Sequence, residues 1–285
     1  MAPTALAALH HAAKSAVLAA LSLSLTQLAR TGTLNRYIAP KLELGVKLSA
    51  LALFALAVFR LWIALRAWQG DDAEADCGCG AHGPAAAGPR QLAVYAMFLL
   101  PIVFGLLPAV PLGSADAARA GIHLPGAAAE HPQRSDTAAD AEAFPFDEFT
   151  RPYAELARRL HALPLIDVPE PLYIETLSSI DLYRKAFAGH RIRLTGFVHR
   201  DSGATDGVYL LSRFAVSCCP ADARAYGLPV LDAQAKQRRT DEWLTVEGVL
   251  EEGVYDGQPA LVLRAEQTRS APPPASPYVY LDPDF

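Results

Sequence analysis

The feature that most constrains this chain is an uncharged apolar run from Leu92 to Leu112. Its 21 residues match the roughly 20 that an α-helix needs to cross a hydrocarbon core about 30 Å thick. Pro101, Pro108 and Pro111 interrupt the run, and prolines are tolerated in membrane helices where neighbouring groups satisfy the freed carbonyls. The run therefore predicts a kinked transmembrane helix over 92–112.

Two earlier apolar segments predict two further spans. One covers about 44–65, where Lys47 and Arg60 bracket an uninterrupted apolar stretch and are long enough to reach a headgroup layer. The other covers about 12–29 and contains several polar side chains, a pattern that favours a helix facing another protein. Together the three segments predict a transmembrane region over 1–112 and a protein in contact with membrane lipid.

The remainder of the chain has a different composition, with most of the prolines and charges. Residues 113–147 are rich in alanine, glycine and proline, which predicts a flexible linker. Residues 148–285 predict a separate domain, because apolar spacing indicates helices over 150–163 and 178–188, followed by strands. The predicted strands cover 190–199, 207–218, 228–231, 243–250 and 260–266.

Gly196 and Gly248 lie inside two of these strands, where glycine often marks a bulge or a tight bend in a small barrel. We therefore expect an OB-like barrel, although periodicity alone does not separate a barrel from a small sandwich. The predicted fold class is an α+β membrane protein: three transmembrane helices followed by a soluble OB-like β-barrel with flanking helices. A net charge of −5 without a basic cluster excludes nucleic acid as an expected partner.

The loop over 70–91 carries Cys77, Cys79 and His82 in the sequence DCGCGAH. Two thiols and an imidazole at this spacing suit Zn²⁺, Cu(I) or a thiophilic metalloid. They supply three good ligands, so we expect a transient site completed by water, another subunit or Asp76. The alternative is a solvated loop whose cysteines are incidental, although loop thiols without a function are an oxidation hazard.

A second cysteine pair, Cys218 and Cys219, precedes a proline turn and is followed by Asp222. At the end of a strand their side chains should point to opposite faces unless the turn reorients them. A disulfide between adjacent cysteines would be strained. One hypothesis is metal capture by either cysteine with Asp222, helped by His199 from a neighbouring strand. The other is that one cysteine is a small buried residue and Asp222 caps the turn.

Several motifs of the chain are similar to one known family. They are, in order, TGTLNRYIAPKL, DCGCGAH, GFVHRD, RFAVSCCPADARAYGLPV, DEWLTVEGVL and SPYVYLDPDF. With its three apolar segments, the chain resembles the YcgQ family of bacterial membrane proteins, described as candidate subunits of a two-component permease. The resemblance implies a larger polytopic permease subunit as partner and a role in metal or metalloid handling. Relatives often carry a His-rich run beside the first cysteine pair, whereas here only His82 stands there, so high-capacity metal buffering is not expected.

These observations lead to one main functional hypothesis and two alternatives. The main one is a non-catalytic permease subunit, multi-pass in the bacterial inner membrane, that handles a soft metal or metalloid through its cysteines. We expect a cytosolic N-terminus and the soluble domain outside, although basic residues are too evenly distributed to fix the orientation. The alternatives are a membrane-tethered interaction scaffold without metal and a thiol oxidoreductase. No Ser/His/Asp set, phosphate-binding loop or pair of catalytic carboxylates is present, so an enzyme is not expected.

Overall fold

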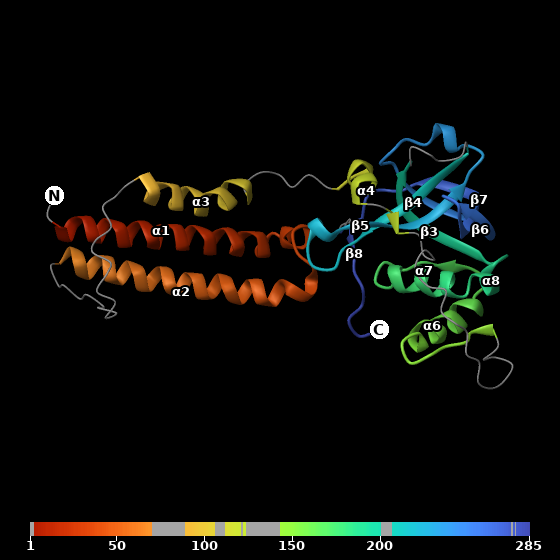
Figure 1. Ribbon diagram of the computed structural model, residues 1–285, viewed down its shortest axis with the longest axis horizontal. Helices are drawn as coiled ribbons and strands as arrows, with labels where there is room; N and C mark the ends of the chain where they lie inside the picture. The colour runs from red at the N-terminus through yellow and green to blue at the C-terminus, as the bar shows by residue number, and fades with distance from the viewer. Residues whose placement is uncertain are drawn as a thin grey trace. The chain divides into compact units, whose positions relative to one another are not determined.

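The computed structural model describes residues 3–69, 89–105, 112–120, 122–123, 143–200, 207–274, 276 and 278–285. The chain folds as two compact units, Met1–Val110 and Pro111–Phe285, called here the helical unit and the sheet unit. The first consists of long helices, and the second is built on a mixed β-sheet with helices beside it (Figure 1).

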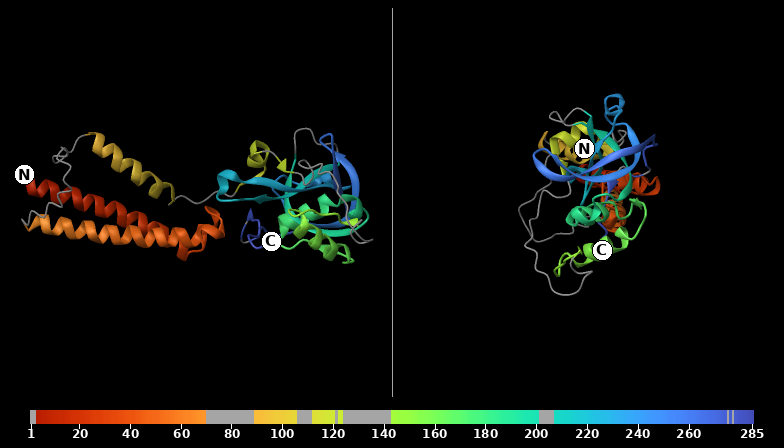
Figure 2. Two further views of the ribbon diagram at one scale, coloured as in Figure 1. Left: turned by 60° about the horizontal axis from the view of Figure 1, so that its bottom comes forward. Right: turned by 90° about the vertical axis from the view of Figure 1, so that its right-hand side faces the viewer.

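The helical unit is an antiparallel helical hairpin with a third helix. Its elements are α1 (Pro3–Arg30), η1 (Thr33–Arg36), η2 (Pro40–Leu42), α2 (Glu43–Trp68) and α3 (Pro89–Gly105). The two short 3₁₀ helices make the turn between α1 and α2, and Gly32 enters this turn with a φ of 70°. Helices α1 and α2 lie side by side along their length (Figures 1 and 2).

Small residues at every seventh position form the seam between α1 and α2. The buried positions are Ala8, Ser15 and Ser22 on α1 and Ala50, Ala57 and Ala64 on α2. Small side chains let two helix backbones approach closely, as in helix pairs within membranes. Ser15 Oγ donates to the Ala57 carbonyl and Ser22 Oγ to the Ala50 carbonyl, both at 2.8 Å. These bonds confirm the prediction that polar residues of the first segment face protein.

Two described helices, not the predicted three, are long and apolar enough to cross a membrane. They cover Ala8–Arg30 and Pro40–Trp68, slightly longer than the predicted spans of 12–29 and 44–65. The described part of α3 has 17 residues, fewer than the roughly 20 that a span requires. Among the described residues, the predicted third span over 92–112 is therefore represented only by a shorter apolar helix with Pro101 inside it, and residues 106–111 lie outside the described residues.

In its described residues, the sheet unit contains eight strands and several short helices. In chain order they are α4 (Ser114–Ala120), β1 (Ile122–His123), α6 (Arg151–His161), β2 (Ile166–Asp167), α7 (Tyr173–Leu182), α8 (Arg184–Phe187), β3 (Arg191–His199), β4 (Val208–Ala215), η3 (Pro220–Asp222), β5 (Arg224–Leu231), η4 (Ala235–Gln237), β6 (Trp243–Tyr255), β7 (Gln258–Ser270) and β8 (Tyr278–Val279). All five predicted strands are confirmed as β3 to β7. Their ends differ, since β4 stops at Ala215 and β5 starts at Arg224.

The sheet is mixed, and its main pairings link five strands in a continuous circuit. Strand β3 pairs antiparallel with β4 and β6, β4 pairs antiparallel with β5, and β6 pairs antiparallel with β7. A short parallel pairing of β5 with β7 completes the circuit. The short strands β1, β2 and β8 add in parallel to β5, β3 and β4.

Two glycines allow neighbouring strands to approach more closely than a side chain would permit. The register of β6 against β7 shifts between Glu247 and Gly248, which confirms the predicted bulge. A Cβ atom on Gly248 would collide with the Arg264 carbonyl, and one on Gly227 with the Leu211 carbonyl. Gly227 therefore lets β4 and β5 approach closely. Gly248 lies at a bulge, and bulges bend a strand and increase its twist.

The helices α6, α7 and α8 cover the main core beside the sheet (Figures 1 and 2). The predicted helix over 150–163 is confirmed as α6. The predicted helix over 178–188 is wrong in its start, because α7 begins at Tyr173 and α8 follows separately. Ser178 does not cap a helix, since its Oγ lies 2.7 Å from the Tyr226 hydroxyl. Ser179 is fully buried. The sequence pattern missed that this helix buries polar side chains.

Part of the predicted linker over 113–147 is folded. Helix α4 is fixed to the sheet unit because Asp241 Oδ1 accepts the Ser114 backbone N–H at 2.7 Å and the Ser114 hydroxyl at 2.6 Å. Ala117 is fully buried, and β1 pairs with β5. Residues 124–142 lie outside the described residues. The start of this segment is therefore the first element of the sheet unit.

Candidate functional site

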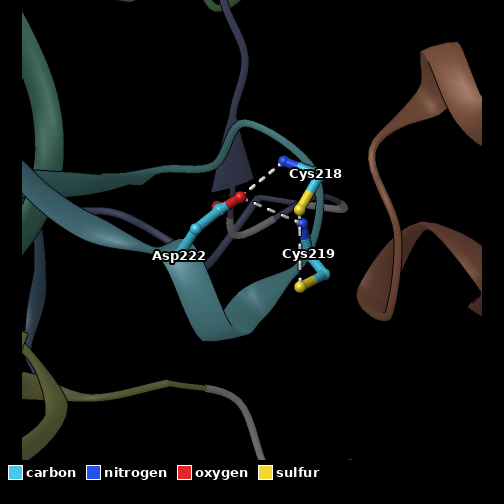
Figure 3. Close-up of side chains that lie close together, drawn as sticks. All are labelled: Cys218, Cys219 and Asp222. Carbon is cyan, nitrogen blue, oxygen red and sulfur yellow. Dashed lines mark hydrogen bonds between the residues drawn. The ribbon is translucent and has the colours of Figure 1, made fainter.

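The candidate site lies in the loop between β4 and β5, residues 216–223, called here the cysteine loop (Figure 3). The loop is supported at its base by the C-terminal segment, since β8 pairs with the end of β4. The Val216 N–H then donates to the Val279 carbonyl at 3.0 Å. Tyr278 and Val279 are both buried. The loop is therefore held between a strand end and a packed strand.

Asp222 organises the backbone of the cysteine loop. Its carboxylate accepts backbone N–H groups from Ser217 at 2.9 Å, Cys218 at 2.7 Å and Cys219 at 3.4 Å. Pro220 starts η3, and its fixed φ suits the first position of a helical turn. Cys219 Sγ in return accepts the backbone N–H of Asp222, a reciprocal capping arrangement. The three residues are thus held together by local hydrogen bonds.

The two cysteine side chains lie together and not on opposite faces, which is the case in which the turn reorients them. Their sulfur atoms are 3.7 Å apart, and both cysteines are free thiols. The prediction assumed that the strand continues to Cys218, but β4 ends at Ala215 and the turn around Asp222 reorients both residues. Cys218 is exposed and Cys219 is half-buried. In the alternative hypothesis, the part in which one cysteine is a small buried residue is therefore wrong, whereas the part in which Asp222 caps the turn is confirmed.

The arrangement fits a soft metal ion. One ligand atom from each of Cys218, Cys219 and Asp222 lies within 4.8 Å of the others. Two thiolates on one tetrahedral Zn²⁺, each at about 2.3 Å, would be about 3.8 Å apart. The observed separation of 3.7 Å between the sulfurs matches that value without movement of the backbone. A fourth ligand position would remain for water or another group.

The electrostatics of the site keep the Cys218 thiol protonated. Its hydrogen bond to the Asp222 carboxylate, then that to Cys219, raise the pKa of Cys218 to about 11. For Asp222, partial burial alone would raise the pKa. Hydrogen bonds from the Cys218 thiol and the loop backbone outweigh that effect and lower the pKa of Asp222 below its usual value. The carboxylate is therefore ionised at neutral pH and faces a neutral thiol.

The other predicted ligands do not join this site. His199 is buried and pairs with Leu210 near the start of β4, whereas the cysteine loop follows the far end of that strand. The prediction that His199 assists the cysteines is therefore wrong. Cys77, Cys79 and His82 lie outside the described residues.

Sequence reasoning did not single out Arg213, which ties the C-terminal segment to the sheet near the cysteine loop. Its side chain is only 4% exposed and lies between the rings of Tyr173 and Trp243. Its Nη2 donates to the Ser276 carbonyl at 2.7 Å and to Glu170 at 3.1 Å. The available signal was a lone cation in a mostly apolar strand.

Comparisons with known proteins match both units. Residues 14–123 match the family model described as the DUF1980 N-terminal domain, and residues 143–281 match the DUF1980 C-terminal domain. A Streptococcus mutans protein named "Putative two-component membrane permease complex subunit" is 27% identical over 195 residues, 64% of this chain and 70% of that protein. The UPF0703 protein YcgQ of Bacillus subtilis is 24% identical over 197 residues, 67% of this chain and 69% of that protein.

The two family models match in the order in which their names place them, and between them they cover most of the chain. The similarity to YcgQ agrees with the resemblance that the sequence motifs indicated. The chain therefore belongs to the DUF1980 family and is similar to YcgQ.

Proposed function

We propose that this protein is a non-catalytic accessory subunit of a membrane permease and that it handles a soft metal or metalloid ion through its cysteines. The observation that carries the metal part is the cysteine loop, where two thiols and a carboxylate converge with a sulfur separation of 3.7 Å. Such a pair suits Zn²⁺, Cu(I) or a thiophilic metalloid because soft ions prefer sulfur ligands. The ion is the cargo of the complex in this proposal.

The permease part rests on the helical unit and on the name of a relative. Both α1 and α2 have the length and composition of a membrane span, and α2 carries many exposed large apolar side chains. The Streptococcus mutans relative is named as a subunit of a two-component membrane permease complex. In this proposal the partner is a larger polytopic subunit, and the complex lies in the bacterial inner membrane. The sheet unit lies on the outer side of that membrane.

The sheet unit in this proposal is an OB-like barrel that carries the cysteine loop. Support comes from the circuit of pairings through β3, β4, β5, β7 and β6, because closure is what distinguishes a barrel from an open sheet. The bulge at Gly248 is the kind of irregularity that curves a strand around such a barrel.

Protons compete with the metal in this site. A thiol must lose its proton to ligate an ion, and the pKa of Cys218 lies near 11. Metal affinity is therefore expected to rise with pH throughout the physiological range. The same raised pKa disfavours the thiol oxidoreductase alternative, since a redox dithiol normally needs a thiolate of low pKa.

A metal-binding experiment with isolated cysteine pairs tests this proposal. Full-length protein is purified in detergent as a Cys77→Ser/Cys79→Ser variant, and Cd²⁺ binding is titrated at pH 6, 7 and 8. We expect the affinity to rise by about tenfold per pH unit for each proton displaced. Adding Cys218→Ser and Cys219→Ser should weaken binding by at least about tenfold, within the range for lost metal-site groups.

The control is Ser217→Ala in the same background, which leaves both sulfurs and Asp222 in place. Equal Cd²⁺ binding with and without Cys218 and Cys219 would overturn the cysteine loop as the metal site. Separately, the protein is expected to remain in the membrane pellet after carbonate washing and to co-purify with a polytopic partner. Release into the aqueous fraction would overturn the permease part.

A further inference from the structure

Two buried side chains of opposite charge bind the backbone near the C-terminus, on either side of β8. The described residues there, 276 and 278–285, are called here the C-terminal segment. Before β8, Arg213 Nη2 donates to the Ser276 carbonyl at 2.7 Å. After β8, Oε1 of Glu175 on α7 accepts the Asp282 backbone N–H at 2.6 Å. The two contacts therefore fix the C-terminal segment at both ends of β8.

The contact with Glu175 is one that the carboxylate needs. Glu175 is fully buried, and burial raises its pKa above the ordinary value, whereas hydrogen bonds from the N–H groups of Asp282 and of Glu175 itself oppose that rise. Among the described residues, these two N–H donors stabilise its negative charge, and no cation does so. Burying a carboxylate is costly unless it is hydrogen-bonded, and hydrogen bonds to an ionised group are the strong ones. The hydrogen bond between Glu175 and Asp282 is therefore a firm constraint on the C-terminal segment.

Strand β8 connects this constraint to the cysteine loop. It has only two residues, and it pairs with the last two residues of β4. So short a pairing is at best marginal in water by itself, so its position depends on the contacts that flank it. The next hydrogen bond joins the Val216 N–H to the Val279 carbonyl at 3.0 Å, and Val216 is the first residue of the cysteine loop. A displaced β8 would therefore release the base of that loop.

We propose that Glu175 is a positioning residue of the cysteine loop and that it acts through the C-terminal segment. By binding the Asp282 N–H, it keeps β8 paired with the end of β4, and β8 in turn holds Val216. The two thiols and the Asp222 carboxylate then stay together for a metal ion. This inference rests on the proposed function of the cysteine loop as a metal site.

Cd²⁺ titration of single and combined variants tests the inference in the Cys77→Ser/Cys79→Ser background. Glu175→Ala removes the acceptor and should weaken binding about tenfold, the lower end for groups that orient metal ligands. Glu175→Gln keeps an acceptor oxygen and should restore most of the affinity. A chain that ends at Leu281 lacks the Asp282 N–H and should bind like Glu175→Ala. Adding Glu175→Ala to that shortened chain should cause no further loss, because both changes break the same connection.

The matched control is Thr176→Ala, a change at the next residue of α7. Thr176 is also buried, and its hydroxyl has no hydrogen-bond partner within the described ranges. This variant should bind Cd²⁺ like the parent. Amide hydrogen exchange of the metal-free protein gives a second measurement. Exchange of the Val216 N–H should become faster in Glu175→Ala and not in Thr176→Ala, while slow exchange in β3 and β6 shows that the sheet unit remains folded.

The outcomes separate this inference from the proposed function. Parent-like affinity of Glu175→Ala, an equal loss in Thr176→Ala, additive losses in the shortened chain or no recovery in Glu175→Gln would each overturn the positioning role. If Glu175→Ala does not fold, the shortened chain decides, and parent-like affinity there overturns the role. If the parent binds no Cd²⁺ through Cys218 and Cys219, the proposed function fails, and exchange of the Val216 N–H still decides whether Glu175 positions the loop.

Discussion

Replacing Asp222 with asparagine is expected to lower the pKa of the Cys218 thiol from about 11 by at least about one unit, a tenfold or greater increase in thiolate at neutral pH. The carboxylate is the largest cause of the raised pKa, because it accepts the thiol hydrogen bond and its negative charge opposes ionisation. Asparagine keeps an oxygen that can accept backbone N–H groups of the loop and removes the charge. The thiol then ionises more readily while the turn can persist.

The measurement is the pH dependence of alkylation at Cys218. Metal-free protein with Cys77→Ser and Cys79→Ser is treated with iodoacetamide between pH 7 and pH 12, and the product is located by fragmentation mass spectrometry. An Asp284→Asn variant is the control, because Asp284 is an exposed aspartate outside the cysteine loop. An unchanged ionisation profile for Asp222→Asn would show that another group keeps the thiol protonated.

The same variant distinguishes two roles for Asp222 in metal binding. If the carboxylate is a ligand, its removal weakens Cd²⁺ binding at every pH. If it mainly keeps the thiol protonated, its removal strengthens binding at neutral pH, because less proton must be displaced. Both carboxylate oxygens already accept loop N–H groups, so we expect the second result. Asp222 then limits metal binding at neutral pH by keeping the Cys218 thiol protonated.

The sequence predicts the strands of the sheet unit well, and its errors have definite causes. Alternating apolar residues locate β3 and β6, because buried positions alternate along much of each strand. The start of α7 is missed because Glu175, Thr176 and Ser179 are polar yet buried, which breaks the usual helical pattern. Of the predicted third span, the described residues show a 17-residue apolar helix with Pro101 inside it.

The candidate site is predictable in its residues and not in its geometry. Cysteine and aspartate types at 218, 219 and 222 indicate soft-metal chemistry without a structure. Their convergence depends on where β4 ends and on three backbone N–H groups that meet one carboxylate. Such a turn leaves no periodic signal in the sequence. The prediction that His199 assists the cysteines fails for a similar reason, since strand register decides which end of the sheet a residue occupies.

A second large effect is expected from Asp181→Asn in α7. Asp181 is only 8% exposed, and its burial raises the pKa from the ordinary 3.8 to about 6, although Arg184 at 3.8 Å opposes the shift. Because the folded-state pKa is raised, the carboxyl group contributes stability that is fully present below about pH 4. That stability is lost as pH rises through about 6. The loss amounts to about 3 kcal/mol of unfolding free energy at neutral pH, and asparagine, having no charge, does not incur it.

Chemical denaturation of the full chain in detergent measures this difference. In a Trp62→Phe/Trp68→Phe background, Trp243 is the single remaining tryptophan and reports on the sheet unit. Between pH 4 and pH 8 the parent should lose up to about 3 kcal/mol more than Asp181→Asn, while Asp284→Asn should follow the parent. The comparison across pH cancels any constant cost of burying the new amide, so parallel curves for parent and Asp181→Asn would show that Asp181 ionises normally. A difference between the two curves that changes by about 3 kcal/mol between pH 4 and pH 8 would instead identify this buried carboxylate as a source of instability in the sheet unit at neutral pH.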